Sequence, residues 1–190
     1  MSERNYSGEI ATMIGAFLKA DNWNYDFDKE TGNFRFGLNT SSKLKYYVRV
    51  NTDAYCVYAI SPVGADVSNL EERAAMAEFL CRANYGMRYG NFEMDLQDGE
   101  LRYKFFVDCD GVLPSPAIVK DSIYMPAATF HHYTPGILAI LFNGASAEEA
   151  IAVRRRDNRI TVFSLRCPRC QTALEICIAQ EEQGSVASAF

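Results

Sequence analysis

The sequence predicts an α+β fold, a two-layer sandwich in which helices pack on one side of an antiparallel β-sheet. Three observations lead to this prediction. Apolar residues recur with the helical period in some segments and with period two in others, and the segments of period two follow one another through short turns. Strands joined in this way form antiparallel sheets, with the helices segregated from them. The 190 residues are 48% apolar, enough for one domain with a core and a small addition.

The first predicted helix covers roughly residues 8–20. Its apolar residues follow the i, i+3, i+4, i+7, i+8 spacing of one buried face, at Ile10, Met13, Ile14, Phe17 and Leu18. Ser7 is the expected N-cap, because its hydroxyl can accept a hydrogen bond from a free backbone N–H of the first turn.

Four strands are predicted next, where apolar and polar residues alternate. They lie within 23–28, 34–38, 44–50 and 54–60, and the first turn reads KETGN. Aromatic and β-branched residues dominate the apolar positions, as is typical of strands. Because one face of each strand is polar, we expect the sheet to be covered on one side only.

A second helix is predicted over about 69–85. Ser68 and Glu71 form the pattern of a capping box, and Gly86 is the expected stop. The expected apolar stripe consists of Leu70, Ala74, Ala77, Cys81 and Tyr85.

A β-hairpin should follow the second helix. One strand alternates at Phe92, Met94 and Leu96, and the other at Leu101, Tyr103, Phe105 and Val107. Asp98-Gly99 lies between them, and this dipeptide favours a type I′ turn because both central residues need positive φ.

The last third of the chain is predicted to be helical, with two strands near its end. Ser115 and Pro116 begin a helix, which Pro126 and Pro135 should break or kink. Ser146 and Glu149 form another capping box. Two strands are expected within 159–178, and the tail from 181 on is expected to be disordered.

The stretch around the predicted hairpin, EFLCRANYGMRYGNFEMDLQDGELRYKFFVD, resembles the core signature of YbjN-like proteins. The residues that carry the resemblance are Asn84, Tyr85, Gly86, Gly90, Asn91, Phe92, Glu93, Asp95, Asp98, Gly99 and Glu100. The resemblance extends over about 8–150. We therefore expect a YbjN-like domain over 1–150 and a small C-terminal extension over 151–190.

The resemblance implies a fold similar to that of class I type III secretion chaperones, which tend to form homodimers. Members of the family are described as sensory-transduction regulators, and no catalytic residue comes with the resemblance. The motif residues are expected to be structural: Gly99 turns the hairpin, Gly86 ends the helix, and Asn84 and Asp95 satisfy backbone groups. The implied function is non-enzymatic binding of another protein or peptide, in a chaperone-like or regulatory role.

Cys167 and Cys170 form a C-x-x-C pair, the one local motif with metal-binding chemistry. Two thiolates at this spacing can hold one zinc ion. Two further ligands would be needed, and the candidates are Cys177, Cys109, His131, His132 or the same pair in a partner subunit. The pair could instead be a redox dithiol, although only 20 residues follow Cys170, or two thiols in a hairpin turn. The other, scattered cysteines are expected to be small buried residues.

Other functional classes find little support in the sequence. No apolar run approaches the length of a membrane span, and the N-terminus lacks the pattern of a secretory signal, so a cytoplasmic protein is expected. Residues 1–150 hold 13 Lys and Arg against 20 Asp and Glu, and 151–190 hold 6 against 4. An acidic body disfavours nucleic acid, apart from the arginine cluster within 154–169. Neither a G-x-S-x-G elbow nor a P-loop is present, so no enzyme class is indicated.

Overall fold

The structure is a computed structural model, which describes residues 5–37, 43–156, 162–166 and 173–177, and the side chains of 5–37 and 43–153. In chain order the elements are α1 (Gly8–Ala20), β1 (Tyr25–Asp28), β2 (Asn33–Gly37), β3 (Lys45–Val50), β4 (Ala54–Ile60), α2 (Leu70–Asn84), β5 (Asn91–Met94), β6 (Leu101–Asp108), α3 (Pro116–Asn143), α4 (Ala147–Arg156), β7 (Val162–Arg166) and β8 (Ala173–Cys177). The predicted strand residue Leu38 and the predicted tail lie outside the described residues.

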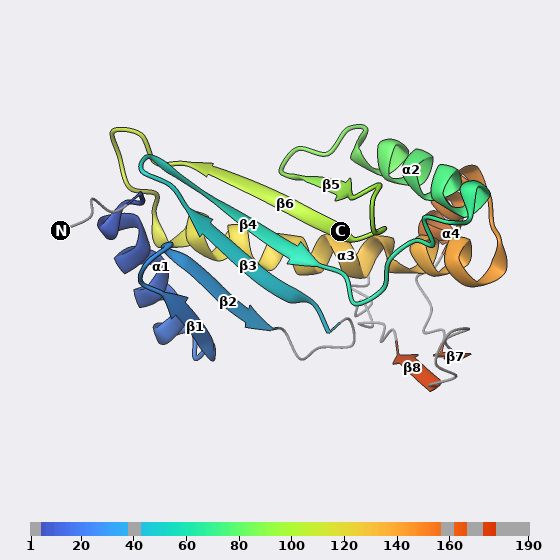
Figure 1. The fold of residues 1–190 in the computed structure, drawn as a ribbon, viewed down its shortest axis with the longest axis horizontal. Coiled ribbons are helices and arrows are strands. Elements are labelled where there is room, and N and C mark those ends of the chain that lie inside the picture. Colours follow the sequence, from blue (N-terminus) through green and yellow to red (C-terminus); the bar gives the residue numbers. More distant parts are fainter. Residues whose placement is uncertain (1–4, 38–42, 157–161, 167–172, 178–190) are drawn as a thin grey trace, which may run out of the picture.

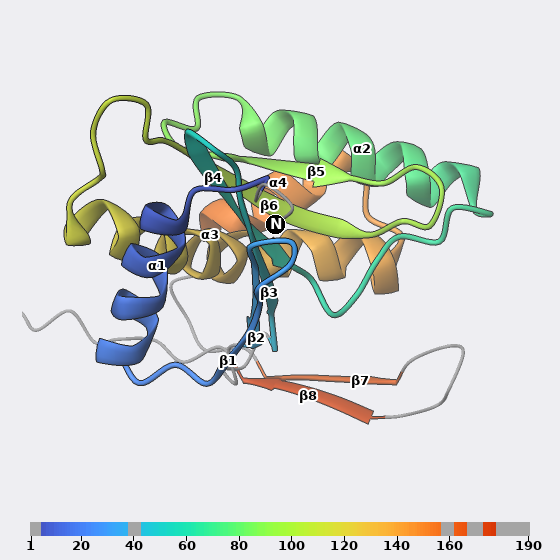
Figure 2. The same ribbon diagram turned by 60° about the vertical axis from the view of Figure 1, so that its left-hand side comes forward.

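Six of the strands form one antiparallel sheet in the order β1-β2-β3-β4-β6-β5. Four helices pack against it, and Figure 1 shows α3 running behind the strands along much of the sheet. Figure 2 shows α1 beside α3, on the same side of the strands. The α+β class predicted from the sequence is confirmed.

The two faces of the sheet follow directly from the alternation in the strands. Phe34, Val48, Val57 and Phe105 are all buried on the helix-covered face, which we call the inner face. Their neighbours in sequence point the other way, to what we call the outer face. The register aligns these positions across strands, so that Phe34 lies opposite Val48 and Val57 opposite Phe105. The core therefore lies between the inner face and the helices.

Helix α1 has the bounds and the N-cap that the sequence predicts. The Ser7 hydroxyl accepts from the Ile10 backbone N–H at 3.3 Å. Ile10, Ile14 and Leu18 are all buried, at 2% exposure or less. Local pattern and tertiary packing agree in this helix.

Helix α2 has nearly the predicted bounds, but its buried face is not the predicted one. The core residues are Met76, Phe79, Leu80 and Ala83. The predicted stripe faces away from the core: all five of its residues are exposed, with Leu70 at 64% and Tyr85 at 93%. Both the buried residues and the predicted stripe have helical spacing. The residues with the larger side chains are the buried ones, because burying them removes more apolar area from water.

The cap of α2 also differs from the prediction. Asn69, not Ser68, is the N-cap, and its side-chain oxygen accepts from the N–H groups of Glu71 and Glu72 at 3.2 and 3.1 Å. The Ser68 hydroxyl instead donates to Asp66 at 2.6 Å. Serine and asparagine are equally good caps, so sequence alone could not choose between neighbours.

The β5–β6 hairpin is present, but its turn is not a two-residue type I′ turn. Gly99 alone has positive φ, at +80°, and Asp98 does not. The Asp95 N–H donates to the Glu100 carbonyl at 2.9 Å, so the connection is longer than predicted and ends β5 at Met94. Leu96, predicted as a strand residue, is 61% exposed in this turn.

Helix α3 runs unbroken from Pro116 to Asn143, through both internal prolines. Of the predicted break or kink at these prolines, the break is wrong. Phenols of the inner face hold the helix around the first proline: the Tyr46 hydroxyl donates to the Ile123 carbonyl at 2.9 Å, and the Tyr55 hydroxyl lies 3.1 Å from Ser122 Oγ. Pro126 cannot donate to the Ser122 carbonyl four residues earlier, and the two phenols anchor the helix at the neighbouring Ile123 carbonyl and Ser122 hydroxyl.

Helix α4 begins with the predicted capping box. The Ser146 N–H donates to Glu149 Oε2 at 2.9 Å, and the Glu149 N–H donates back to the Ser146 hydroxyl at 3.3 Å. The domain boundary suggested between residues 150 and 151 falls inside this helix, whose Ala147 and Ala150 belong to the core. The two expected C-terminal strands, β7 and β8, pair antiparallel as a separate sheet.

Candidate functional site

The motif residues that suggested a family lie where α2 ends and β5 begins. The Asn84 side chain accepts from the Phe92 N–H at 2.7 Å and donates to the Phe92 carbonyl at 3.0 Å. It thus pairs with both backbone groups of one residue of edge strand β5, as a neighbouring strand would. Gly86 follows the end of α2 with φ of +84°, a conformation that favours glycine.

Phe92 anchors this strand to α3. Its ring is 3% exposed and meets three other aromatic rings edge-on: Tyr103 at 5.2 Å, Phe130 at 5.1 Å and Tyr133 at 5.3 Å between centroids. Edge-to-face contacts at these distances are favourable beyond the area that they bury. This aromatic cluster packs β5, β6 and α3 against one another.

Two glycines of the motif are required by close backbone approach. A Cβ on Gly99 would lie 2.0 Å from the Ala65 carbonyl oxygen, and one on Gly90 would lie 2.5 Å from the Lys104 carbonyl oxygen. Both residues also have positive φ. Asp95 accepts from the Gln97 N–H at 2.8 Å, so its side chain satisfies a backbone group in the hairpin turn.

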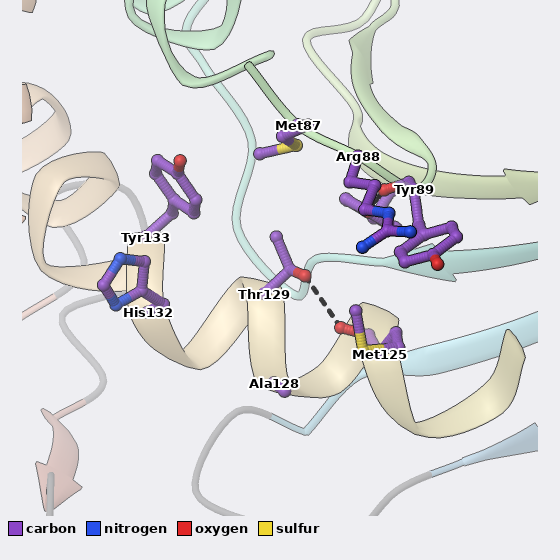
Figure 3. A pocket seen from close by; sticks show the side chains of 9 residues that line it. Met87, Arg88, Tyr89, Met125, Ala128, Thr129, His132 and Tyr133 are labelled. Atoms are coloured by element: carbon purple, nitrogen blue, oxygen red, sulfur yellow. Dashed lines mark hydrogen bonds between the residues drawn. The ribbon is translucent and has the colours of Figure 1, made fainter. Parts of the chain in front are cut away.

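Next to this aromatic cluster, the loop after α2 and helix α3 line a pocket of about 290 Å³. Figure 3 shows Thr129, His132 and Tyr133 of α3 on one side, with Met87, Arg88 and Tyr89 of the loop on the other. The complete lining is Met87, Arg88, Tyr89, Tyr103, Met125, Ala128, Thr129, His132 and Tyr133. The pocket is therefore built from the motif loop, from Tyr103 of β6 and from α3, where only His132 had been named from the sequence, as a possible zinc ligand.

Hydrogen bonds hold the polar groups of the lining in place. The Thr129 hydroxyl donates to the Met125 carbonyl at 2.8 Å, the Tyr133 hydroxyl donates to the Ala83 carbonyl at 3.2 Å, and the Tyr103 hydroxyl donates to the Tyr89 carbonyl. Burial raises the pKa of Tyr103 above its ordinary value, so this phenol stays neutral. Arg88 lies with its guanidinium carbon 5.3 Å from the centre of the Tyr89 ring.

The chemistry of the pocket suits binding. Its lining holds no carboxylate, cysteine or serine, and its one threonine hydroxyl already donates to the backbone. Methionine side chains adapt their shape to an apolar guest, and the tyrosine, histidine and arginine groups can orient it. A general base paired with a nucleophile is not among these residues.

The remaining predicted site residues are dispersed. Tyr85 points to solvent, and Asp95 and Gly99 lie at the far end of β5 from the pocket. His131 and His132 are both exposed. Cys56 and Cys109 are buried as expected, but Cys81 is exposed. Cys167 and Cys170 lie outside the described residues, so zinc binding there stays a prediction.

The contribution of α3 to the pocket was not predicted from the sequence. Met125, Thr129, His132 and Tyr133 follow one another at helical spacing on one side of the helix. That signal was available, but the break or kink expected at Pro126 separated Met125 from the other three. A continuous helix was needed to unite them.

Within the described ranges, no three His, Cys, Asp or Glu side chains lie together as a metal site would require. Nor is any helix there both long and apolar enough to cross a bilayer. Compared with known proteins, the chain matches no family model and no curated protein.

Proposed function

We propose that this chain is a non-enzymatic protein-binding protein of the YbjN-like type, with a two-layer sandwich similar to type III secretion chaperones. It acts as a chaperone-like or regulatory homodimer in the cytoplasm. The observation that supports this function best is the pocket between the motif loop and α3. Its apolar lining, with two methionines and three tyrosines, suits an apolar side chain of a partner polypeptide.

The size of the pocket supports a side chain as its occupant. At about 290 Å³ it lies just below the volumes of small-molecule sites, which run from about 300 to 1,000 Å³. Its wall of loop residues 87–89 also lies directly beside exposed surface, since Tyr85 and Tyr89 are 93% and 49% exposed. A peptide could continue over these rings on either side of its anchoring residue.

The exposed stripe of α2 supports the proposed homodimer. Leu70, Cys81 and Tyr85 are exposed along one helix face, with Ala74 and Ala77 between them. Small residues at the middle of such a face let a second backbone approach closely, and exposed apolar area of this kind is typical of interaction surfaces.

Thr129→Trp tests the proposed peptide pocket, because Thr129 points into it and an indole would fill it (Figure 3). Peptides selected from a displayed random library against the wild-type protein should share an apolar anchor. They should bind the variant about tenfold more weakly or worse, which is the size of effect expected at a buried anchor. Native mass spectrometry of the same preparation should give a dimer.

Thr12→Trp is the matched control. Thr12 lies on α1, and its hydroxyl also donates to the carbonyl four residues earlier, at 2.7 Å. Selected peptides should bind this variant as they bind the wild type. If the selected peptides bind Thr129→Trp as tightly as the wild type, the pocket is not their binding site. An enzymatic activity abolished by one point substitution would contradict the non-enzymatic function.

A further inference from the structure

The four inner strands of the sheet carry a charge opposite to that of the whole chain. The net charge is −5, yet the charged residues of β2, β3, β4 and β6 are five cations and one carboxylate, Asp108. The cations are Arg35, Lys45, Arg49, Arg102 and Lys104, each alternating with buried core residues and thus pointing outward. The edge strands β1 and β5 add the carboxylates Asp26, Asp28 and Glu93, so the basic region is confined to the middle of the outer face.

The centre of this face is apolar. Tyr47 lies opposite Tyr58 in the β3–β4 register, with their ring centroids 6.2 Å apart. Ile60 is on the same side of β4, and on β6 the Phe106 ring is 56% exposed. A hollow of about 480 Å³ opens beside Tyr47 and Ile60, where Gly37 has no side chain.

The cations flank this apolar centre on both sides. Lys45 and Arg49 belong to β3, and Arg102 and Lys104 belong to β6, with β4 between the two strands. Two strand spacings separate the flanks by about 10 Å. This width is close to that of an α-helix with its side chains, roughly 10–12 Å.

The ion pairs on the outer face show that its cations accept a carboxylate. Glu93 of β5 already lies 2.8 Å from Arg102 Nε and 3.3 Å from Lys104 Nζ. Within the described residues no carboxylate comes within ion-pair distance of Lys45, Arg49 or Arg35, although Asp26 lies opposite Arg35 in the register. The β3 flank therefore has cations available for a partner.

We propose that the outer face binds an acidic amphipathic helix of a partner protein, laid along β4. Its apolar stripe contacts Ile60 and the ring edges of Tyr47 and Tyr58, because Arg35 and Arg102 lie over the faces of these rings. Carboxylates at the borders of the stripe meet Lys45 and Arg49 on one side. Helices cover sheet faces in this way throughout α+β proteins. The proposal rests on the protein-binding function above but uses another surface, so the two can fail separately.

Single-stranded nucleic acid is the competing polyanion, and the geometry disfavours it. Stacked bases need free aromatic faces. Arginine guanidinium carbons already lie over both tyrosines, Arg35 at 5.9 Å from the Tyr47 centroid and Arg102 at 4.8 Å from that of Tyr58. A long polyanion would also meet the acidic remainder of the protein.

The test uses the full chain and a fluorescein-labelled helical peptide of about 18 residues, long enough to be a marginal helix, with a leucine stripe bordered by glutamates. Anisotropy titrations at low and at physiological salt compare it with the same peptide carrying glutamine for glutamate. Lys45→Glu/Arg49→Glu is the variant. Lys19→Glu/Lys120→Glu, two exposed lysines on helices, makes the same change in net charge.

The glutamate peptide should bind more weakly at the higher salt, and the face variant should weaken it by about tenfold or more, as loss of interfacial charge pairs does. The control variant should change the affinity less than about twofold. Equal affinity of the glutamine peptide, an equal effect of the control, or no binding by the wild type would each overturn the proposal. So would a labelled oligothymidylate or oligouridylate that binds in place of the peptide. Thr129→Trp should leave this binding unchanged, which separates the two surfaces.

Discussion

The inner and outer faces of the sheet use the same strands and residues one position apart, but they differ in chemistry. The inner face is closed by aromatic rings such as Phe34 and Phe92, at 1% and 3% exposure. The outer face leaves Phe106 at 56% exposure and surrounds its aromatic residues with cations. An aromatic residue on one face builds the fold, and on the other it remains available for contact.

The composition of a strand is a poor guide to the roles of its residues. Strand β6 reads LRYKFFVD, in which Phe105 is 8% exposed and the adjacent Phe106 is 56% exposed. The two residues differ only in the face of the sheet to which they point, because successive side chains of a strand alternate between the two faces. Substitutions on the two faces should therefore separate stability from binding.

The largest effect is expected for Phe92→Ala on the inner face. Removing this ring from its aromatic cluster should lower the free energy of unfolding by about 3–5 kcal/mol, the usual cost of Phe→Ala in a core. Phe106→Ala is the matched change on the outer face and should cost less than about 1 kcal/mol. Urea denaturation measures both, and equal losses would show that the two faces are equally packed.

An intermediate effect is expected for Asn84→Ala, at the junction of α2 and the edge of the sheet. It leaves the Phe92 N–H and carbonyl without the partners at 2.7 and 3.0 Å. The cost should be about 1–3 kcal/mol, that of a partly buried polar group left unpaired. Asn24→Ala, at an exposed position, is the control. Amide hydrogen exchange at Phe92 should accelerate in the first variant alone.

The smallest effect is expected from the outer-face ion pairs. Burial works to raise the pKa of Glu93, but Arg102 and Lys104 more than offset it, so the pKa is lowered from its ordinary 4.5. Because the folded-state pKa is the lower one, this stabilisation is present above the ordinary value and is lost as the pH falls through the lowered pKa. For this partly exposed group the stabilisation should not exceed about 1 kcal/mol.

Glu93→Gln measures that contribution. Between neutral and acidic pH its unfolding free energy should fall less steeply than that of the wild type. Glu30→Gln, in the exposed β1–β2 turn, should keep the wild-type slope. If both variants follow the wild-type curve, the ion pairs of Glu93 contribute nothing to folding.

Helices α1 and α2 show how much of a helix and its buried face could be predicted from local sequence. In α1 one apolar face has no rival, and both its bounds and its buried residues could be predicted. In α2 two faces have helical spacing, and the choice of Met76 and Phe79 over Leu70 and Tyr85 needed the partner surfaces of β5, α3 and α4. The site depended on the same kind of information, since the motif loop was recognisable but its partners on α3 were not.

By itself, the sequence determined the α+β class, the alternation of the strands and the capping box of α4, because hydrogen bonds in turns and the period of apolar residues are local properties. Tertiary structure decided which face of α2 is buried, that α3 continues through Pro126 and Pro135, and that its residues meet Met87 and Tyr89 in a pocket. Those outcomes depend on competition between alternative contacts over long separations in the chain. The alternative that buries more apolar area and satisfies more backbone groups prevails, and it exists only once the elements have assembled.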